Sequence, residues 1–173
     1  MNARIIYKEG REGENVLDAI VGIAVPMLDG REVIVYPKYK ECQLLEDKDA
    51  EEWKDEPVTE FEALRSTRDI REITDSLVKA GSPAAKFVRA QGDYSLPGLR
   101  EAEAVFTFRK DIDKLASSIE GADLIDRPFL YIWSGFRFGA YYAWIANGNV
   151  GYFFNGLFYL GYLAVPVSLF QLA

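Results

Sequence analysis

The pattern of apolar and polar positions divides the chain into a mixed beginning, a helical middle and an aromatic end. Arg4–Tyr7 and Arg31–Tyr36 are rich in β-branched and aromatic residues, so each predicts a short strand. Between them, Asn15–Ala24 has apolar residues at helical spacing and predicts a helix. Pro26 and the Asp29-Gly30 turn would end that helix before the second strand.

The middle of the chain predicts helices. Thr59–Ala80 keeps an approximate 3.6-residue period of apolar side chains, and a glycine follows it as a C-cap signal. Ser82-Pro83 then supplies an N-cap and a first-turn proline for a second helix, which runs to about Gln91. A further apolar helical face lies between Ser95 and Gly121.

The end of the chain changes to short aromatic runs separated by glycine and asparagine. These runs predict strands over Phe129–Trp133, Tyr141–Ile145, Gly151–Phe154 and Tyr162–Val167. The expected turns are at Gly135, Gly139, Asn147-Gly148-Asn149 and Asn155-Gly156. Helices followed by an antiparallel meander predict an α+β protein. We expect one domain over 1–173, with 1–80 as its N-terminal part and 129–170 as its C-terminal binding region.

One uncharged stretch, Val150–Phe170, is long enough at 21 residues to cross a membrane. Glycine, asparagine and proline interrupt it, and no Lys or Arg flanks it as a topology anchor. Aromatic runs broken by Asn-Gly suit hairpins better than one helix. We therefore expect strands here and no membrane span.

Composition excludes several classes of site. The chain has no histidine, which removes Ser-His-Asp and Cys-His catalysis and histidine metal sites. Its single cysteine, Cys42, excludes an internal disulfide and a four-cysteine zinc site. A net charge of -7 argues against a nucleic-acid partner, which needs a basic patch. The first residues alternate charged and apolar groups, so no signal peptide is expected.

Charge is distributed very unevenly along the chain. From Pro128 to Ala173 there is one charged residue, Arg137, and the other 46 charges lie in residues 1–127. The window Phe129–Tyr162 also holds 14 of the 24 aromatic residues. Such a composition exposes more apolar area than a soluble monomer usually tolerates, unless the surface binds a target or lies in an oligomer. We therefore expect the function in this last part of the chain.

The segment from Glu41 to Glu62 is crowded with carboxylates. A calcium loop is one interpretation, but the segment lacks the regular Asp-x-Asp-x-Asp-Gly spacing of such loops. A solvated acidic face is favoured, and we expect no metal site and no cofactor.

Two parts of the chain resemble the C-type lectin fold. Gly92-Asp-Tyr-Ser-Leu-Pro-Gly-Leu-Arg-Glu-Ala-Glu is similar to the Asp-Trp-Arg-Leu-Pro-Thr-x-x-Glu-Leu segment that enters a helix shortly before the final sheet of that fold. The later motifs resemble its Trp-Ser-Ser…Ala-Trp…Gly…Val-Arg-Pro-Val end, in the order Tyr131-Ile-Trp-Ser-Gly, Tyr142-Ala-Trp144, Asn147-Gly148 and Ala164-Val-Pro-Val167. The resemblance covers roughly residues 82–170. It departs at Tyr94-Ser95, where the family has Trp-Arg, and at Val165, where the family often has Arg.

Within that fold, the chain resembles the variable proteins of diversity-generating retroelements most. The resemblance implies a C-terminal region that is rewritten by adenine-directed mutagenesis of asparagine codons. If the third base of such a codon stays a pyrimidine, the mutated codon never encodes Lys, Glu, Gln, Met or Trp. Residues 134–165 contain none of these except Trp144, whereas residues 100–127 carry several Lys and Glu.

The resemblance and the aromatic pattern together give a set of candidate variable or ligand-binding positions. They are Phe136, Phe138, Tyr141, Tyr142, Ile145, Asn147, Tyr152, Phe153, Phe154, Leu157, Phe158, Tyr159, Leu160, Tyr162 and Leu163. Strand alternation requires that some of them face inward, and Phe158 and Tyr159, between two turn signals, are the strongest candidates. Aromatic side chains supply large contact area at low rotamer cost. Arg137 is either a binding hot spot or a solubilising residue, and the sequence leaves both open.

The resemblance implies a non-catalytic target-recognition protein, at a viral tail-fibre tip or on a cell surface, that binds a host or partner macromolecule, expected to be a protein. A fixed viral adhesin and an oligomer-forming structural domain are alternatives, and homo-oligomerisation stays open. An enzyme is the alternative of a different class. Glu101 with Glu103, or Asp111 with Asp113, could supply acid-base carboxylates, although such residues are ordinarily on a solvated helix face.

Overall fold

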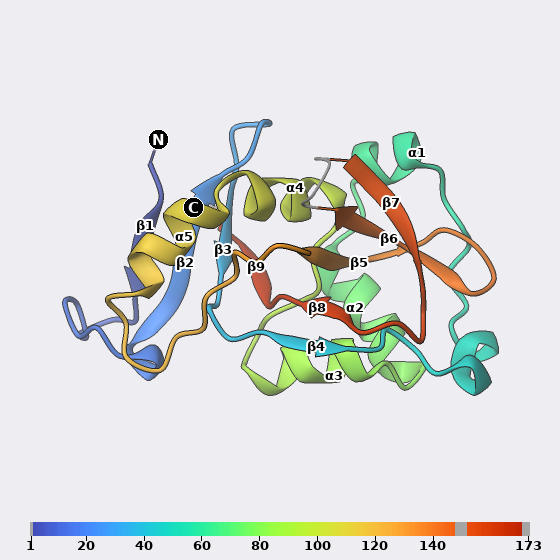
Figure 1. Cartoon of the computed structure of the whole chain (residues 1–173), viewed down its shortest axis with the longest axis horizontal. Helices are drawn as coiled ribbons and strands as arrows, with labels where there is room; N and C mark the ends of the chain where they lie inside the picture. The colour runs from blue at the N-terminus through green and yellow to red at the C-terminus, as the bar shows by residue number, and fades with distance from the viewer. Residues whose placement is uncertain (1, 148–151, 171–173) are drawn as a thin grey trace.

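The computed structural model describes residues 2–147 and 152–170, and for Tyr152 and Phe170 it describes the strand position alone. Helices and strands are both abundant, which confirms the predicted α+β class (Figure 1). The first strands are β1 (Arg4–Tyr7), β2 (Ile20–Pro26), β3 (Glu32–Val35) and β4 (Lys40–Cys42). The helices that follow are α1 (Glu60–Arg65), α2 (Ile70–Lys79), α3 (Pro83–Ala90), α4 (Leu99–Thr107) and α5 (Arg109–Ala116). The last strands are β5 (Tyr131–Arg137), β6 (Tyr142–Asn147), β7 (Tyr152–Leu157), β8 (Tyr162–Ala164) and β9 (Val167–Phe170).

The strands form two sheets. The first has the order β1-β2-β3-β9 and is antiparallel throughout, so the last strand of the chain completes the N-terminal sheet. The second has the order β4-β8-β5-β6-β7. In it, β5, β6 and β7 form the predicted antiparallel meander, but β8 is parallel to β5. The predicted strand Tyr162–Val167 is therefore two strands, β8 and β9, which lie in different sheets.

The helices pack on the sheets and leave part of the second sheet open. In Figure 1, α5 lies along β2, and α4 lies near both sheets. Helix α2 packs on β5, and α3 packs on β4 and β8. Among the helices that the structure describes, none is long and apolar enough to cross a membrane.

The predicted helix over Asn15–Ala24 is wrong. Leu17–Ala19 makes one short 3-10 turn, and Ile20–Pro26 is strand β2 in the interior of the first sheet. Most side chains of β2 are buried, on both faces of the sheet. A strand buried on both faces is apolar at nearly every position, so it also satisfies the apolar period of a helix.

The predicted helix over Thr59–Ala80 is two helices. The Thr59 hydroxyl accepts the backbone N–H of Glu62, whose side chain in turn accepts the backbone N–H of Thr59, and this capping box starts α1. Asp69 is the N-cap of the second helix, α2, because its side chain accepts the backbone N–H of Arg71. The predicted N-cap at Ser82 is confirmed, because its hydroxyl accepts the backbone N–H of Ala85.

Two predicted turns are also wrong, because Gly135 lies inside β5 and Asn155-Gly156 lies inside β7. Each glycine makes room for a neighbouring side chain. A Cβ at Gly135 would lie 2.7 Å from Cγ2 of Ile73, and one at Gly156 would lie 2.3 Å from Cε2 of Tyr162. Glycine within a strand commonly marks such a close approach rather than a turn. The turn at Gly139 follows β5 as predicted, and the Gly148-Asn149 part of the other turn lies outside the described residues.

Candidate functional site

One face of the second sheet carries a row of apolar side chains. Trp133, Ile145 and Phe154 lie opposite one another on β5, β6 and β7. Residues paired in this way project from the same face of a sheet. Trp133 and Ile145 are buried, whereas 58% of Phe154 is exposed. The row therefore runs from the interior of the protein to an open edge at β7.

Two tyrosines continue the row toward β8. The ring centre of Tyr162 lies 4.8 Å from that of Trp133 and 5.1 Å from that of Tyr131. Both tyrosines are half-buried. Burial raises the pKa of the Tyr162 phenol, with a smaller contribution from Tyr131. Tyr131, Phe154 and Tyr162 are termed the sheet-face patch.

A second group of exposed aromatic residues lies at the turn between β5 and β6. Phe138, Tyr141 and Tyr142 are all exposed there. The ring of Phe138 packs edge-on against Trp144 at 4.8 Å between ring centres, and the indole Nε1 of Trp144 donates to the carbonyl of Val58 at 2.8 Å. Phe138, Tyr141 and Tyr142 are termed the hairpin patch, in which Phe138 contacts both Trp144 and Tyr142.

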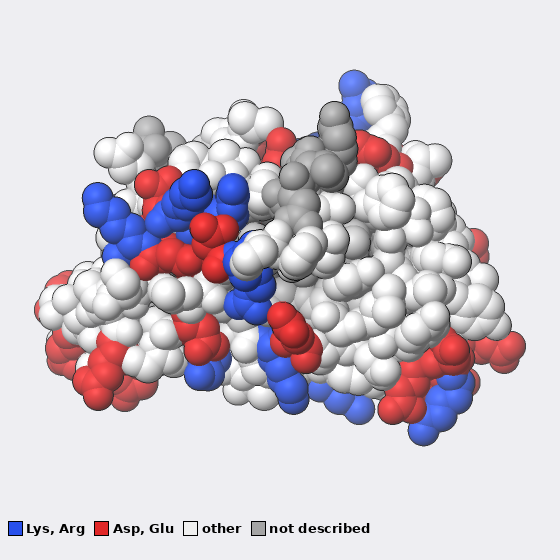
Figure 2. Space-filling view, in the orientation of Figure 1, with Lys and Arg blue, Asp and Glu red and all other residues white. Residues whose placement is uncertain are grey.

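Tyr142 and Phe154 lie on different faces of the sheet. Tyr142 is three residues from Ile145 on the same strand, and Ile145 shares a face with its partner Phe154, so Tyr142 projects from the opposite face. The two patches are therefore not parts of one open sheet face. Figure 2 shows that the area over β5 to β8 is largely free of acidic and basic side chains, which gather toward its edges.

Arg137, the one charged residue of the last part of the chain, is tied to the backbone. Its guanidinium donates to the carbonyls of Trp53 at 2.6 Å, Gly139 at 2.9 Å and Ala140 at 2.8 Å. It also lies 5.2 Å from the ring centre of Trp53. Arg137 therefore joins the end of β5 to the segment before α1, a structural role that neither sequence interpretation included.

The structure places the predicted site residues in three environments. The exposed ones are Phe138, Tyr141, Tyr142, Phe154 and Tyr159. The half-buried ones are Asn147, Phe153, Leu157, Leu160 and Tyr162. The buried ones are Phe136, Ile145, Phe158 and Leu163. The side chain of Tyr152 lies outside the described residues.

For the buried residues, the expectation of a surface position is corrected. Phe158, a leading candidate, is fully buried, with its ring centre 5.5 Å from that of Trp53. The backbone N–H of Leu44 donates to the carbonyl of Phe158, so the segment after β4 covers it. Ile145 and Leu163 face inward through strand alternation, and Phe136 packs with Trp144 in a small core cluster.

The sequence prediction missed Tyr131, which belongs to the sheet-face patch. The signal was present, because Tyr131 is two residues from Trp133 and alternate residues of a strand share a face. The candidate set began after this strand position and so left Tyr131 out.

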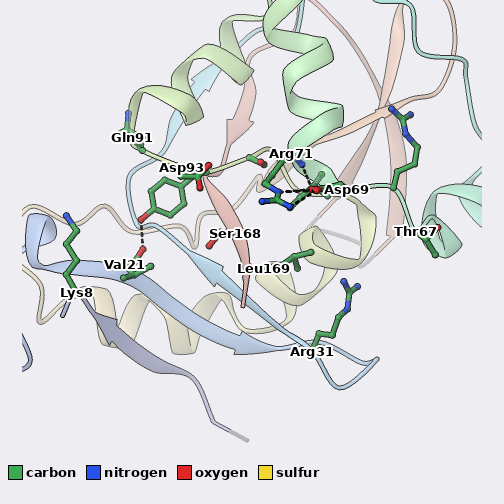
Figure 3. A pocket seen from close by; sticks show the side chains of 15 residues that line it. Lys8, Val21, Arg31, Thr67, Asp69, Arg71, Gln91, Asp93, Ser168 and Leu169 are labelled. Atoms are coloured by element: carbon green, nitrogen blue, oxygen red, sulfur yellow. Dashed lines mark hydrogen bonds and ion pairs between the residues drawn. The ribbon is translucent and has the colours of Figure 1, made fainter. Parts of the chain in front are cut away.

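A separate polar groove of about 700 Å³ shares no residue with either patch. Figure 3 shows Lys8 and Arg31 on its strand side, and Asp69 and Arg71 at the start of α2. Arg71 donates to both carboxylate oxygens of Asp69, and this contact lowers the pKa of Asp69. Arg31 donates two N–H groups to one carboxylate oxygen of Asp29. The groove therefore has arginines whose charge is largely compensated by the protein's own carboxylates.

The carboxylates considered for catalysis do not come together at a cavity. Glu101 is buried at the start of α4, and burial raises its pKa. Glu103 lines a different, small cavity of about 160 Å³. Asp113 accepts the backbone N–H groups of Ile125 and Asp126 at 2.7 and 2.8 Å, which is a structural use. Over residues 2–147 and 152–170, no cluster of three or more acidic or cysteine side chains could hold a metal ion.

The exposed aromatic patches are therefore the candidate functional surface, because they combine large exposed side chains with an uncharged surrounding region. Comparisons of the chain with protein-family models, with curated proteins and with solved structures found no match.

Proposed function

We propose that the protein is a non-catalytic target-recognition module whose C-terminal sheet binds a partner macromolecule, expected to be a protein. One observation supports the proposal most: large aromatic side chains stay exposed in a region whose one charged side chain, Arg137, is hydrogen-bonded to backbone carbonyls of the protein itself. Phe154, Tyr141 and Tyr159 are each exposed by close to half or more, while Arg137 is held by backbone carbonyls. Exposed aromatic residues of this kind are typical of binding surfaces.

The patches stand on a rigid base, which favours binding. Trp133 donates its indole N–H to the carbonyl of Cys42 at 2.8 Å, and Trp144 donates to Val58 at the same distance. Each bond ties a strand of the sheet to a segment that precedes the helices. Rigid support lowers the entropy cost of ordering side chains when a partner binds.

We also propose the C-type lectin fold and retroelement diversification for this chain. In support, α4 begins at Leu99, inside the segment that carries the first motif, and the β5–β6–β7 meander follows it. Variation would then act on the exposed and half-buried positions. Phe136, Ile145, Phe158 and Leu163 would belong to the scaffold, because substitutions at fully packed positions destabilise a protein. Display at a viral tail-fibre tip or on a cell surface is part of the same proposal.

A fixed adhesin is the second candidate, because the same patches would serve it without diversification. The two are distinguished by the genome around the gene. Diversification requires a near-copy of residues 134–165 in which asparagine codons replace codons for Phe, Tyr or Leu, close to a reverse transcriptase gene. If no such copy exists, diversification is refuted and the fixed adhesin remains.

The binding function is tested with labelled protein on a panel of intact cells of different species. Tyr141→Ser combined with Tyr142→Ser removes two aromatic residues of the hairpin patch, and we expect binding to fall by at least about tenfold. Leu28→Ser is the matched control, because Leu28 is 94% exposed on the turn between β2 and β3. Equal binding by the double variant and the wild type would refute the hairpin patch as the binding surface.

A further inference from the structure

Strand β7 is an edge of the second sheet. It pairs with β6 on one side, and no strand in the described part of the chain pairs with its other side (Figure 1). Proteins usually protect such edges with charged residues or proline. The opposite edge, β4, follows this rule through exposed Lys40 and Glu41. Tyr152–Leu157 contains no charged residue and no proline.

The hydrogen bonds of the sheet show which backbone groups of β7 are free to pair. The carbonyl of Tyr142 accepts the N–H of Phe138, which lies on the β5 side, and the carbonyl of Tyr141 accepts the N–H of Phe158 at 3.0 Å. In an antiparallel ladder, alternate residues bond to opposite neighbours. Phe158 bonds to the β6 side, so the alternate residues before it, Gly156, Phe154 and Tyr152, also bond to β6. The backbone N–H and C=O groups of Phe153 and Asn155 therefore point outward.

We infer that β7 pairs antiparallel with β7 of a second copy of this chain. With a two-fold axis at Phe154, Phe153 of one copy exchanges both backbone hydrogen bonds with Asn155 of the other. Phe154 then lies opposite its own counterpart in a pair without hydrogen bonds, the arrangement in which cross-strand side chains come closest.

Several features make a second copy the fitting occupant. Antiparallel pairing is self-complementary under two-fold symmetry, so one strand supplies both halves of the interface. Because β7 is uncharged, self-pairing brings no like charges together. The pairing also covers Phe154, which is 58% exposed in the single chain. Aromatic pairs across strands are favourable, so packing of Phe154 against its counterpart would explain why this side chain is exposed in the single chain.

The dimer would carry the sheets of the two copies side by side as one larger sheet. A two-fold axis between antiparallel edge strands stands perpendicular to the sheet, so the same face of each copy points the same way. Tyr131 and Tyr162 of both copies would then lie on one side of the dimer. This geometry does not depend on what the patches bind.

The test is sedimentation velocity over protein concentrations from about 1 μM to about 300 μM. We expect a concentration-dependent dimer for the wild type. Phe154→Lys opposes two ammonium groups across the axis and should weaken the dimer at least about tenfold. Asn155→Pro removes an outward N–H without removing a bond to β6, and proline is tolerated at such edge positions. Leu28→Lys, on the exposed turn between β2 and β3, is the control and should leave the dimer unchanged.

Hydrogen exchange gives a second measurement that does not depend on a variant. The amides of Phe153 and Asn155 should gain protection as the protein concentration rises, whereas those of Phe154 and Gly156 should be protected at every concentration. A wild type that stays monomeric throughout the range would overturn the inference. So would a dimer that both β7 variants leave intact. Because this test measures self-association and the cell assay measures target binding through the hairpin patch, each can fail alone.

Discussion

The ring of Tyr162 occupies the space that a side chain at position 156 would need. Cε2 of Tyr162 lies 2.3 Å and Cδ2 lies 3.0 Å from an ideal Cβ at Gly156. The ring is held there by contacts with Tyr131 and Trp133. The position of Tyr162 in the sheet-face patch therefore depends on the absence of a side chain at Gly156, on strand β7 at the far edge of the same sheet.

Gly156→Ala should displace Tyr162 and destabilise the protein by about 1–3 kcal/mol, as overpacking usually does. The free energy of unfolding in urea measures the effect. Gly161→Ala is the control, because a Cβ there meets nothing within 4 Å. If the two variants unfold at the same urea concentration, the close approach of Tyr162 to Gly156 is not maintained in solution.

Arg137→Gln should cost about 2 kcal/mol of stability, because it removes charge-assisted hydrogen bonds to carbonyls of two chain segments. Thermal or urea unfolding measures the loss. Arg11→Gln is the matched control, since Arg11 pairs with Glu14 on the surface and such pairs contribute little. A loss no larger than that of Arg11→Gln would show that Arg137 does not brace the segment before α1.

Glu101 and Glu32 should give opposite dependences of stability on pH. Burial raises the pKa of Glu101, so its contribution to stability is present below its unfolded pKa and is lost as pH rises through the folded pKa. The hydrogen bond from Arg4 lowers the pKa of Glu32, so its contribution is present above the unfolded pKa and is lost as pH falls through the folded pKa.

The measurement is the free energy of unfolding of Glu101→Gln and Glu32→Gln at a series of pH values from about 3 to about 7. Relative to the wild type, Glu101→Gln should become more stable as pH rises, and Glu32→Gln should become less stable. Each variant is the control for the other, because both remove one carboxylate. The same sign of slope for both would contradict the assigned environments.

Cys42 should be slow to react in the folded protein. Burial raises the pKa of its thiol to about 11, and the reactive thiolate is scarce at neutral pH as a result. At pH 8, we expect alkylation by iodoacetamide to be at least about 100-fold slower in the native than in the urea-unfolded protein. The native rate should rise about tenfold for each unit of pH. Equal rates in both states would place Cys42 at an open surface.

Local signals in the sequence predicted much of the fold. The strands near Arg4 and Arg31, the capped start at Ser82 and the meander of β5, β6 and β7 depend on neighbouring residues, which a sequence pattern reports directly. Strand β2 could not be told from a helix, because burial on both faces removes the alternation of apolar and polar positions.

The candidate site was predicted only in part, because contacts between distant segments decide burial. Tyr159 is exposed, as expected, but Phe158 beside it is covered by Leu44 and Trp53, more than a hundred residues earlier in the chain. Asn155-Gly156 has the composition of a turn, yet Gly156 serves the packing of Tyr162 within a strand. No pattern of neighbouring residues contains these contacts.

Strand β9 completes the N-terminal sheet by pairing with β3, and Val35 lies opposite Val167. During synthesis, that sheet stays one strand short until the segment around Val167 has left the ribosome. Pairings between such distant residues form slowly, because a long loop must close first. The N-terminal hairpin should therefore keep an unpaired edge at β3 for as long as residues 36–166 are being synthesised.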